Sequence, residues 1–137
     1  MTTHPSRQEN MVKPFEVDFA ADAARLADVR HALQAWLDEV PVDPNEAYDI
    51  VLAVGEACTN AVEHGHRGDG GTIRLSAALT ETDVHIVVSD GGRWVVPAPD
   101  TDQARGRGMG IMRALSSEFE VSTSAAGTVV VMRFARV

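Results

Sequence analysis

The spacing of apolar residues between Ala47 and Val62 constrains the fold of this chain more than any other feature. Apolar positions recur there every three or four residues, which is the period of one helix face. The preceding segment Asp43-Pro44-Asn45-Glu46 combines a capping carboxylate, a proline at the first helical position and a glutamate three residues after the cap. The pattern predicts an amphipathic helix that stops at Gly65. Its apolar face consists of Ala47, Ile50, Val51, Val54, Ala57, Cys58, Ala61 and Val62.

Other segments of the chain carry equally readable patterns. A second apolar stripe runs between Asp22, which can cap a helix, and Pro41, which ends it. A third, shorter stripe begins at Ile111 and predicts a short helix. Alternating apolar residues predict strands near 15–20, 73–79, 84–88, 119–123 and 128–134. A turn at 81–83 joins the second and third strands into a hairpin, and a long loop runs from Asp90 to Arg105.

The order of these elements defines the fold class. It reads strand, helix, helix, strand, strand, long loop, helix, strand, strand, which predicts an α+β fold, a two-layer α/β sandwich. We expect a mixed, mostly antiparallel sheet with the helices on one face. A length of 137 residues allows one domain, over 15–137, after a disordered tail at 1–14. A loop as long as 91–105 in so small a domain is usually functional.

Charge and cysteine content exclude several classes of protein. The chain has 20 acidic and 12 basic residues and a net charge of -8, so duplex nucleic acid is not an expected partner. The single cysteine, Cys58, can form no internal disulfide and fits a reducing compartment. The N-terminal stretch lacks an apolar signal-peptide core, and no apolar run is long enough to span a bilayer. We therefore expect a cytoplasmic protein without a membrane partner.

Two common nucleotide-binding schemes lack a required residue here. Only Lys13 among the 12 basic residues is a lysine, whereas a P-loop needs a lysine after its glycines and a eukaryotic-type protein kinase needs one on a strand. A dinucleotide-binding fold needs G-x-G-x-x-G directly after a strand. The chain instead has G-x-G-x-G, at 106–110, after a loop.

Two polar side chains of the central helix are spaced to act together. Glu56 and Asn60 lie one turn apart, on the side opposite the apolar stripe, so both can point at one object. A solvated helix face is the alternative interpretation. Asp90 ends a predicted strand and is followed by two glycines, which also suits an ordinary turn.

The segment Gly106-Arg107-Gly108-Met109-Gly110 precedes the predicted helix at Ile111. Glycines at alternate positions remove side chains where backbone N–H groups converge, and a helix N-terminus adds partial positive charge. A polyphosphate can lie against such a backbone. A glycine hinge or a plain turn is the alternative.

In combination, these segments resemble the motifs of the GHKL ATPase superfamily. Residues 56–64 resemble its N box, 90–92 its first glycine box, 106–110 its second, and Gly127-Thr128 its closing-strand motif. The resemblance spans residues 15–135 and is greatest to the RsbW and SpoIIAB type of anti-sigma factor, a free-standing serine kinase. It implies a Bergerat-type ATP-binding fold.

The resemblance also implies roles for individual residues. Asn60 would hold Mg²⁺, and Asp90 would accept a hydrogen bond from the adenine amino group with support from Thr128. Glu56 would be the general base, and residues 93–105 would form a lid over ATP. The full set implied to bind the cofactor is Asn60, Asp90, Gly92, Gly106, Arg107, Gly108, Met109, Gly110 and Thr128.

The implied function is that of an ATP- and Mg²⁺-dependent protein-serine kinase. Its partners would be an anti-anti-sigma factor, a STAS domain that carries the acceptor serine, and a sigma factor that it sequesters, and it would form a homodimer. One residue departs from the pattern, because Trp94 stands where the fuller first glycine box, D-x-G-x-G, has its second glycine. The alternative is therefore an ATP-binding regulatory module that holds a sigma factor or another regulator without phosphotransfer.

Overall fold

The computed structural model describes residues 13–66, 71–91, 103–124 and 127–136. Its strands form one five-stranded sheet in the order β1-β2-β3-β5-β4. The strands are β1 (Phe15–Ala20), β2 (Thr72–Leu79), β3 (Asp83–Asp90), β4 (Glu118–Ser124) and β5 (Gly127–Ala135). All four neighbouring pairs are antiparallel. We expected a mixed, mostly antiparallel sheet, but the described strands contain no parallel pair.

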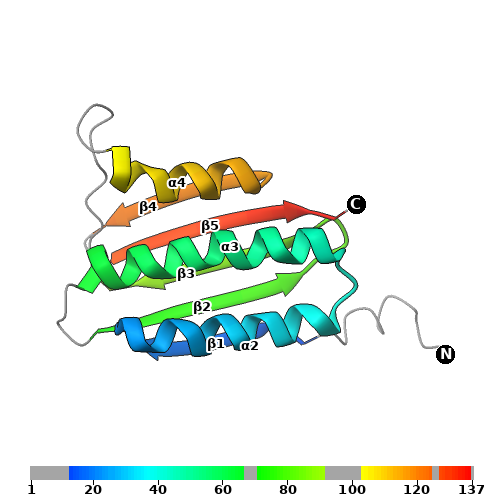
Figure 1. The fold of residues 1–137 in the computed structure, drawn as a ribbon, viewed down its shortest axis with the longest axis horizontal. Coiled ribbons are helices and arrows are strands. Elements are labelled where there is room, and N and C mark those ends of the chain that lie inside the picture. The colour runs from blue at the N-terminus through cyan, green and yellow to red at the C-terminus, as the bar shows by residue number, and fades with distance from the viewer. Residues whose placement is uncertain (1–12, 67–70, 92–102, 125–126, 137) are drawn as a thin grey trace.

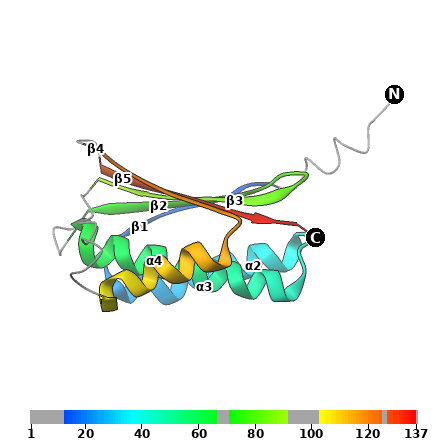
Figure 2. The same cartoon turned by 90° about the horizontal axis from the view of Figure 1, so that it is seen from above.

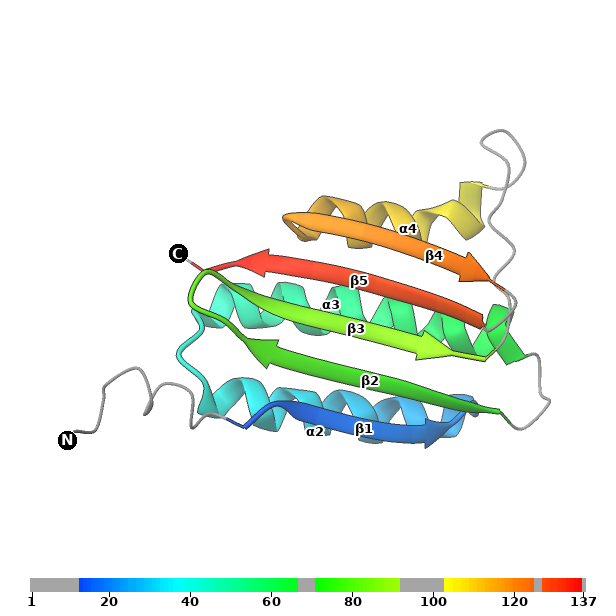
Figure 3. The same cartoon turned by 180° about the vertical axis from the view of Figure 1, so that it is seen from behind.

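Three α-helices cover one face of this sheet (Figures 1 and 2). They are α2 (Leu26–Glu39), α3 (Pro44–Asn60) and α4 (Gln103–Leu115). The 3-10 turn η1 (Ala23–Arg25) leads into α2, and the π-helical segment η2 (Ala61–His66) continues α3. In Figure 3 no described helix crosses the opposite face of the sheet. The predicted two-layer α+β architecture is confirmed.

Side-chain caps start η1 and α3 where the sequence predicts them. The Asp22 carboxylate accepts a hydrogen bond of 2.9 Å from the backbone N–H of Ala24. The Asp43 carboxylate accepts one of 2.7 Å from the backbone N–H of Asn45, and Pro44 occupies the first turn. Each cap satisfies an N–H group that the helix leaves without a partner and contributes about 1 kcal/mol.

The predicted start of the last helix is wrong. We expected the helix to begin at Ile111, after the glycine motif, but α4 begins at Gln103 and contains residues 106–110. A glycine inside a helix costs about 1 kcal/mol relative to alanine. Packing outweighs that cost here, because Met112 is fully buried in the core and Met109 and Leu115 pack against it.

The end of the central helix also differs from the prediction. The regular α-helix stops at Asn60, and the chain continues to His66 as a π-helix rather than as α-helix up to Gly65. A π-turn contains an extra residue per turn and occurs often at functional sites.

Two predicted segments fall wholly or partly outside the description. The expected tail at 1–14 is described only at Lys13 and Pro14, where the Lys13 carbonyl accepts a hydrogen bond of 2.8 Å from the indole N–H of Trp36. Of the expected lid at 93–105, residues 93–102 lie outside the described part, and residues 103–105 belong to α4. No helix in the described part of the chain is long and apolar enough to cross a membrane.

The core lies between the sheet and the helices. Alternate residues of β3, namely Val84, Ile86 and Val88, are buried on the side that faces the helices, and they belong to one core cluster with Ile50 and Cys58 of α3. Burial raises the pKa of the Cys58 thiol to about 12, because a thiolate is poorly solvated in an apolar interior.

We expect Cys58 to react with a thiol reagent only when the protein unfolds. The folded thiol stays neutral at pH 8, far below its pKa of about 12, whereas the unfolded thiol ionises near the ordinary value of 9.0. Labelling with DTNB should therefore be slow in buffer and rapid in guanidinium chloride. Because the unfolded state loses its proton first, the free energy of unfolding should fall as the pH rises above about 9. Rapid, complete labelling of the folded protein would contradict this burial.

Candidate functional site

Three polar side chains are buried in the described part of the chain, and they lie at one end of the molecule. Asn60, Asp90 and Thr128 are 9%, 8% and 0% exposed. They occupy the end of α3, the end of β3 and the start of β5, which meet at the left of Figure 1. Polar groups are seldom buried in a protein core, so three of them gathered at one end of the molecule make this the candidate site. All three residues are predicted by the sequence.

The sheet register places Asp90 directly beside Thr128. The two residues are Cα partners in the antiparallel pairing of β3 with β5. Directly paired residues project to the same face of a sheet. Both are buried in line with Val88 and Val130, on the side that the helices cover. A carboxylate and a hydroxyl therefore share the helix-facing side at the edge of the core.

Gly127 is a residue whose role sequence reasoning missed. Its φ of +133° lies in the region that side chains disfavour. A Cβ atom built on Gly127 would overlap the Asp90 carbonyl oxygen and would lie 2.8 Å from the Cα of Gly91. Only glycine therefore allows the start of β5 to approach the end of β3 this closely. The sequence pattern places Gly127 in a motif and in a turn, but no local pattern indicates its contact with Asp90.

Glu56 and Asn60 of α3 differ in exposure. Glu56 is half-buried, whereas Asn60 is 9% exposed, so the expectation that both lie opposite the apolar stripe is wrong for Asn60. Four residues turn a helix by about 400°, so Asn60 is rotated about 40° from Glu56. This rotation places Asn60 closer to the apolar stripe, and α4 and η2 both contact α3.

The second glycine motif lies within α4 rather than before it. Only the first turn of a helix has N–H groups without a partner inside the helix. Gly108 and Gly110 lie beyond that turn of α4, so their N–H groups belong to its own hydrogen-bond ladder, contrary to our expectation. Met109 is half-buried against the core, and Gly110 is exposed, with open space where a Cβ would lie.

The remaining predicted site residues are not described. Gly92 and Trp94 lie outside the described residues. The backbone of Gly106 and Arg107 is part of α4, but the structure describes no side chains from 103 to 108. Within the described residues, no group of three or more His, Cys, Asp or Glu side chains is arranged to hold a metal ion.

Comparison with known proteins gives this arrangement a class. Residues 19–134 match the model of the histidine kinase-like ATPase domain, and the chain belongs to that family. An anti-sigma F factor from Pasteuria penetrans is 33% identical, with 85% of this chain and 87% of the relative covered. An anti-sigma F factor from Clostridium acetobutylicum is 25% identical, at 86% and 90% coverage. A serine-protein kinase RsbW from Bacillus thuringiensis is 30% identical, but the match covers 56% of this chain and 48% of the relative.

Solved structures agree with this assignment. The RsbU and RsbW domains of a Mycobacterium tuberculosis protein superpose with a TM-score of 0.73 at 30% identity, over 91% of this chain and 33% of that chain. A blue-light activated histidine kinase from Erythrobacter litoralis superposes with a TM-score of 0.60 at 23% identity, over 81% of this chain and 40% of that chain, which shows the shared fold alone.

We expect the substitution Gly127→Ala to damage this end of the molecule. The added methyl group meets the Asp90 carbonyl, in a backbone conformation that costs alanine about 1–3 kcal/mol. The melting temperature should fall by several degrees and the affinity for ATP should drop, as measured by thermal unfolding and isothermal titration. Gly91→Ala is the matched control, because a Cβ at Gly91 meets nothing within 4 Å. Equal losses in both variants would contradict the proposed contact.

Proposed function

We propose that this chain is an ATP- and Mg²⁺-dependent protein-serine kinase that also sequesters a sigma factor. The observation that carries the proposal is the buried cluster of Asn60, Asp90 and Thr128, with Glu56 one turn from Asn60 on the same helix. Membership of a kinase-like ATPase family supports it, as do relatives named anti-sigma F factor and serine-protein kinase RsbW.

The chemistry of the buried cluster fits a nucleotide and its metal ion. The amide oxygen of Asn60 is a hard ligand of the kind that Mg²⁺ prefers, and one or two protein ligands suffice where phosphates supply others. The Asp90 carboxylate would accept a hydrogen bond from the adenine amino group, and the neighbouring Thr128 hydroxyl would assist. Held by Asn60, Mg²⁺ would supply positive charge that offsets the negative charge of the transferring group.

Glu56 would act on the acceptor. Its half-buried carboxylate is reachable from outside the helix layer yet close in sequence to the metal ligand. As the acceptor's serine oxygen forms its bond to the γ-phosphorus and the bond to ADP breaks, Glu56 would take the hydroxyl proton. The acceptor would be an anti-anti-sigma factor, a STAS domain. We further propose that the protein acts as a homodimer in the cytoplasm, where a sigma factor is found.

A binding module without phosphotransfer is the second candidate. The observation that favours it is Trp94, which replaces a glycine at the base of the proposed lid. In that case ATP would set the shape of the protein while it holds a sigma factor or another regulator.

A single-turnover assay separates the two candidates. With γ-labelled ATP and a serine-bearing STAS domain, the wild-type protein should transfer the label to the serine. Glu56→Ala should lower the transfer rate by about 10²–10⁴-fold, the usual contribution of a general base, while ATP affinity changes little. Glu56→Gln, which keeps the shape but cannot take the proton, should be equally slow. A wild-type protein that binds ATP and labels none of the STAS domains from its own genome would support the binding module.

The metal role of Asn60 predicts a distinct phenotype. Wild-type protein should bind ATP more tightly with Mg²⁺ than with excess EDTA, and Asn60→Ala should remove most of that difference. Isothermal titration under both conditions measures it, and thermal unfolding of the apo-protein checks that the variant is folded. A folded Asn60→Ala variant with an unchanged Mg²⁺ dependence would remove Asn60 from the metal site.

A further inference from the structure

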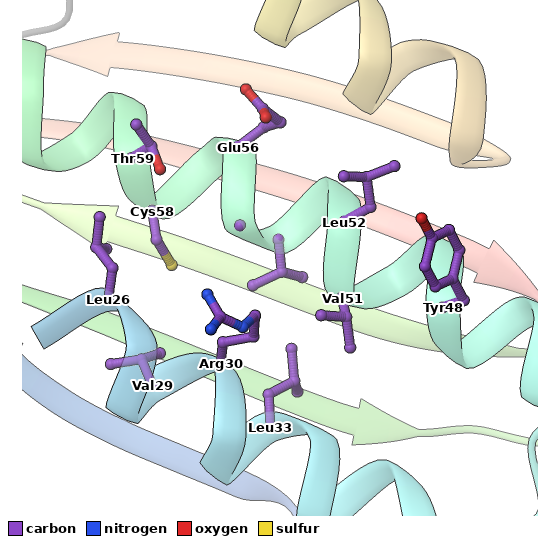
Figure 4. Close-up of a pocket in the computed structure, with 12 residues that line it drawn as sticks. Leu26, Val29, Arg30, Leu33, Tyr48, Val51, Leu52, Glu56, Cys58 and Thr59 are labelled. Atoms are coloured by element: carbon purple, nitrogen blue, oxygen red, sulfur yellow. The ribbon is translucent and has the colours of Figure 1, made fainter.

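A groove runs between α2 and α3 on the outer side of the helix layer (Figure 4). It encloses about 390 Å³. We call it the anchor groove, and its apolar walls are Leu26, Val29 and Leu33 of α2 with Tyr48, Val51 and Leu52 of α3. Nothing in the nucleotide chemistry proposed above uses this groove. Glu56, however, lies on its rim.

The wall of the groove contributed by α3 includes a glycine. Gly55 lines the groove and is half-buried, and a Cβ built there meets nothing within 4 Å. No close approach of the backbone therefore requires glycine at this position. In a helix interior glycine costs about 1 kcal/mol relative to alanine. Because Gly55 has no side chain, it leaves room in the groove for a side chain of another protein.

Exposed apolar side chains lead from one end of the groove toward Glu56. Tyr48 and Leu52 are 68% and 39% exposed, and they are two of the three large apolar residues exposed in the described part of the chain. Successive steps of four residues join Tyr48, Leu52 and Glu56, so the three lie along one side of α3. A cluster of exposed apolar side chains beside a groove is typical of a protein-binding surface.

We propose that the anchor groove receives an apolar side chain of the acceptor protein, next to the acceptor's serine, and so brings the hydroxyl to Glu56. This inference rests on the proposed kinase function. The position of Glu56 selects this occupant, because the acceptor is the one partner whose chemistry requires contact with that carboxylate. A second copy of this chain in the groove would instead cover Glu56 and block transfer.

Binding energy in the groove would serve positioning. An apolar side chain of the acceptor would be buried in the groove equally before and during phosphate transfer. Losing this contact should therefore weaken binding of the acceptor. A helix face or an extended segment laid in a groove is a common way for one protein to hold another. The groove would therefore determine which serine is presented to the nucleotide, because its lining reaches Thr59, directly before the proposed metal ligand Asn60.

Filling the groove from inside tests the proposal. In Gly55→Leu the new side chain occupies the anchor's place, and the helix loses a glycine, so we expect no loss of thermal stability. The probes are the serine-bearing STAS domains of the same genome, each titrated calorimetrically against the ATP-loaded protein. For the domain that binds wild type, Gly55→Leu should weaken binding by at least about tenfold, the equivalent of about 1.4 kcal/mol. ATP affinity should be unchanged.

Two further variants make the result specific. Leu52→Asp places a charge on the apolar wall and should also weaken acceptor binding, without adding bulk. Ala35→Leu is the matched control, because Ala35 is exposed on α2 outside the groove and receives the same new side chain. It should bind the acceptor as wild type does.

The outcomes separate the groove from the kinase. If a STAS domain binds and Gly55→Leu binds it equally well, the groove proposal is overturned whatever the transfer assay shows. A loss of sigma-factor binding alone, with acceptor binding intact, also overturns it. If Gly55→Leu abolishes binding of the STAS domain but wild type transfers no phosphate, the groove stands as a docking site, whereas the kinase function and the presentation of a serine to Glu56 are overturned. If no STAS domain binds wild type, both are overturned.

Discussion

The pairing of β3 with β5 is the interaction on which the candidate site depends. It joins residues that are distant in the sequence and sets Asp90 opposite Thr128 on the helix-facing side. A slip of one residue in this register would send one of these two side chains to the other face of the sheet. Gly127 secures the pairing at its end, because only a residue without a Cβ fits against the Asp90 carbonyl. Main-chain packing therefore decides where the polar side chains lie.

The helix α3 connects this polar end to the rest of the proposed mechanism. One continuous segment carries Tyr48 and Leu52 on the anchor groove, Glu56 on its rim, and Asn60 at its end. Along the helix, the residues proposed to contact the partner come first, the proposed base follows, and the proposed metal ligand comes last. Because a packed helix is rigid, these groups keep fixed spacings. Its apolar face against the sheet, including Ile50, Val54 and Ala57, holds it in place.

Much of this arrangement can be predicted from the sequence because it is encoded locally. The caps at Asp22 and Asp43, the apolar stripe of α3 and the alternation in β2, β3 and β5 each occupy a few consecutive residues. Asn60, Asp90 and Thr128 were identified by motif resemblance, and the structure gathers them at one end.

What could not be predicted depends on contacts between distant segments. The start of α4 at Gln103 goes against the helix propensity of its glycines, and the same helix packs Met112 into the core. The burial of Asn60 depends on the neighbours of α3, and the need for glycine at 127 depends on the backbone of another strand. The groove beside Gly55 exists only once α2 lies against α3.

The most direct test of the account is calorimetric titration of the purified protein with ATP and with GTP, each in the presence of Mg²⁺. If Asp90 accepts a hydrogen bond from the base, ATP should bind and GTP should bind far more weakly, because guanine carries a carbonyl oxygen where adenine carries its amino group. No measurable binding of ATP by the folded protein, or equal binding of both nucleotides, would contradict the assignment of this buried cluster to an adenine nucleotide.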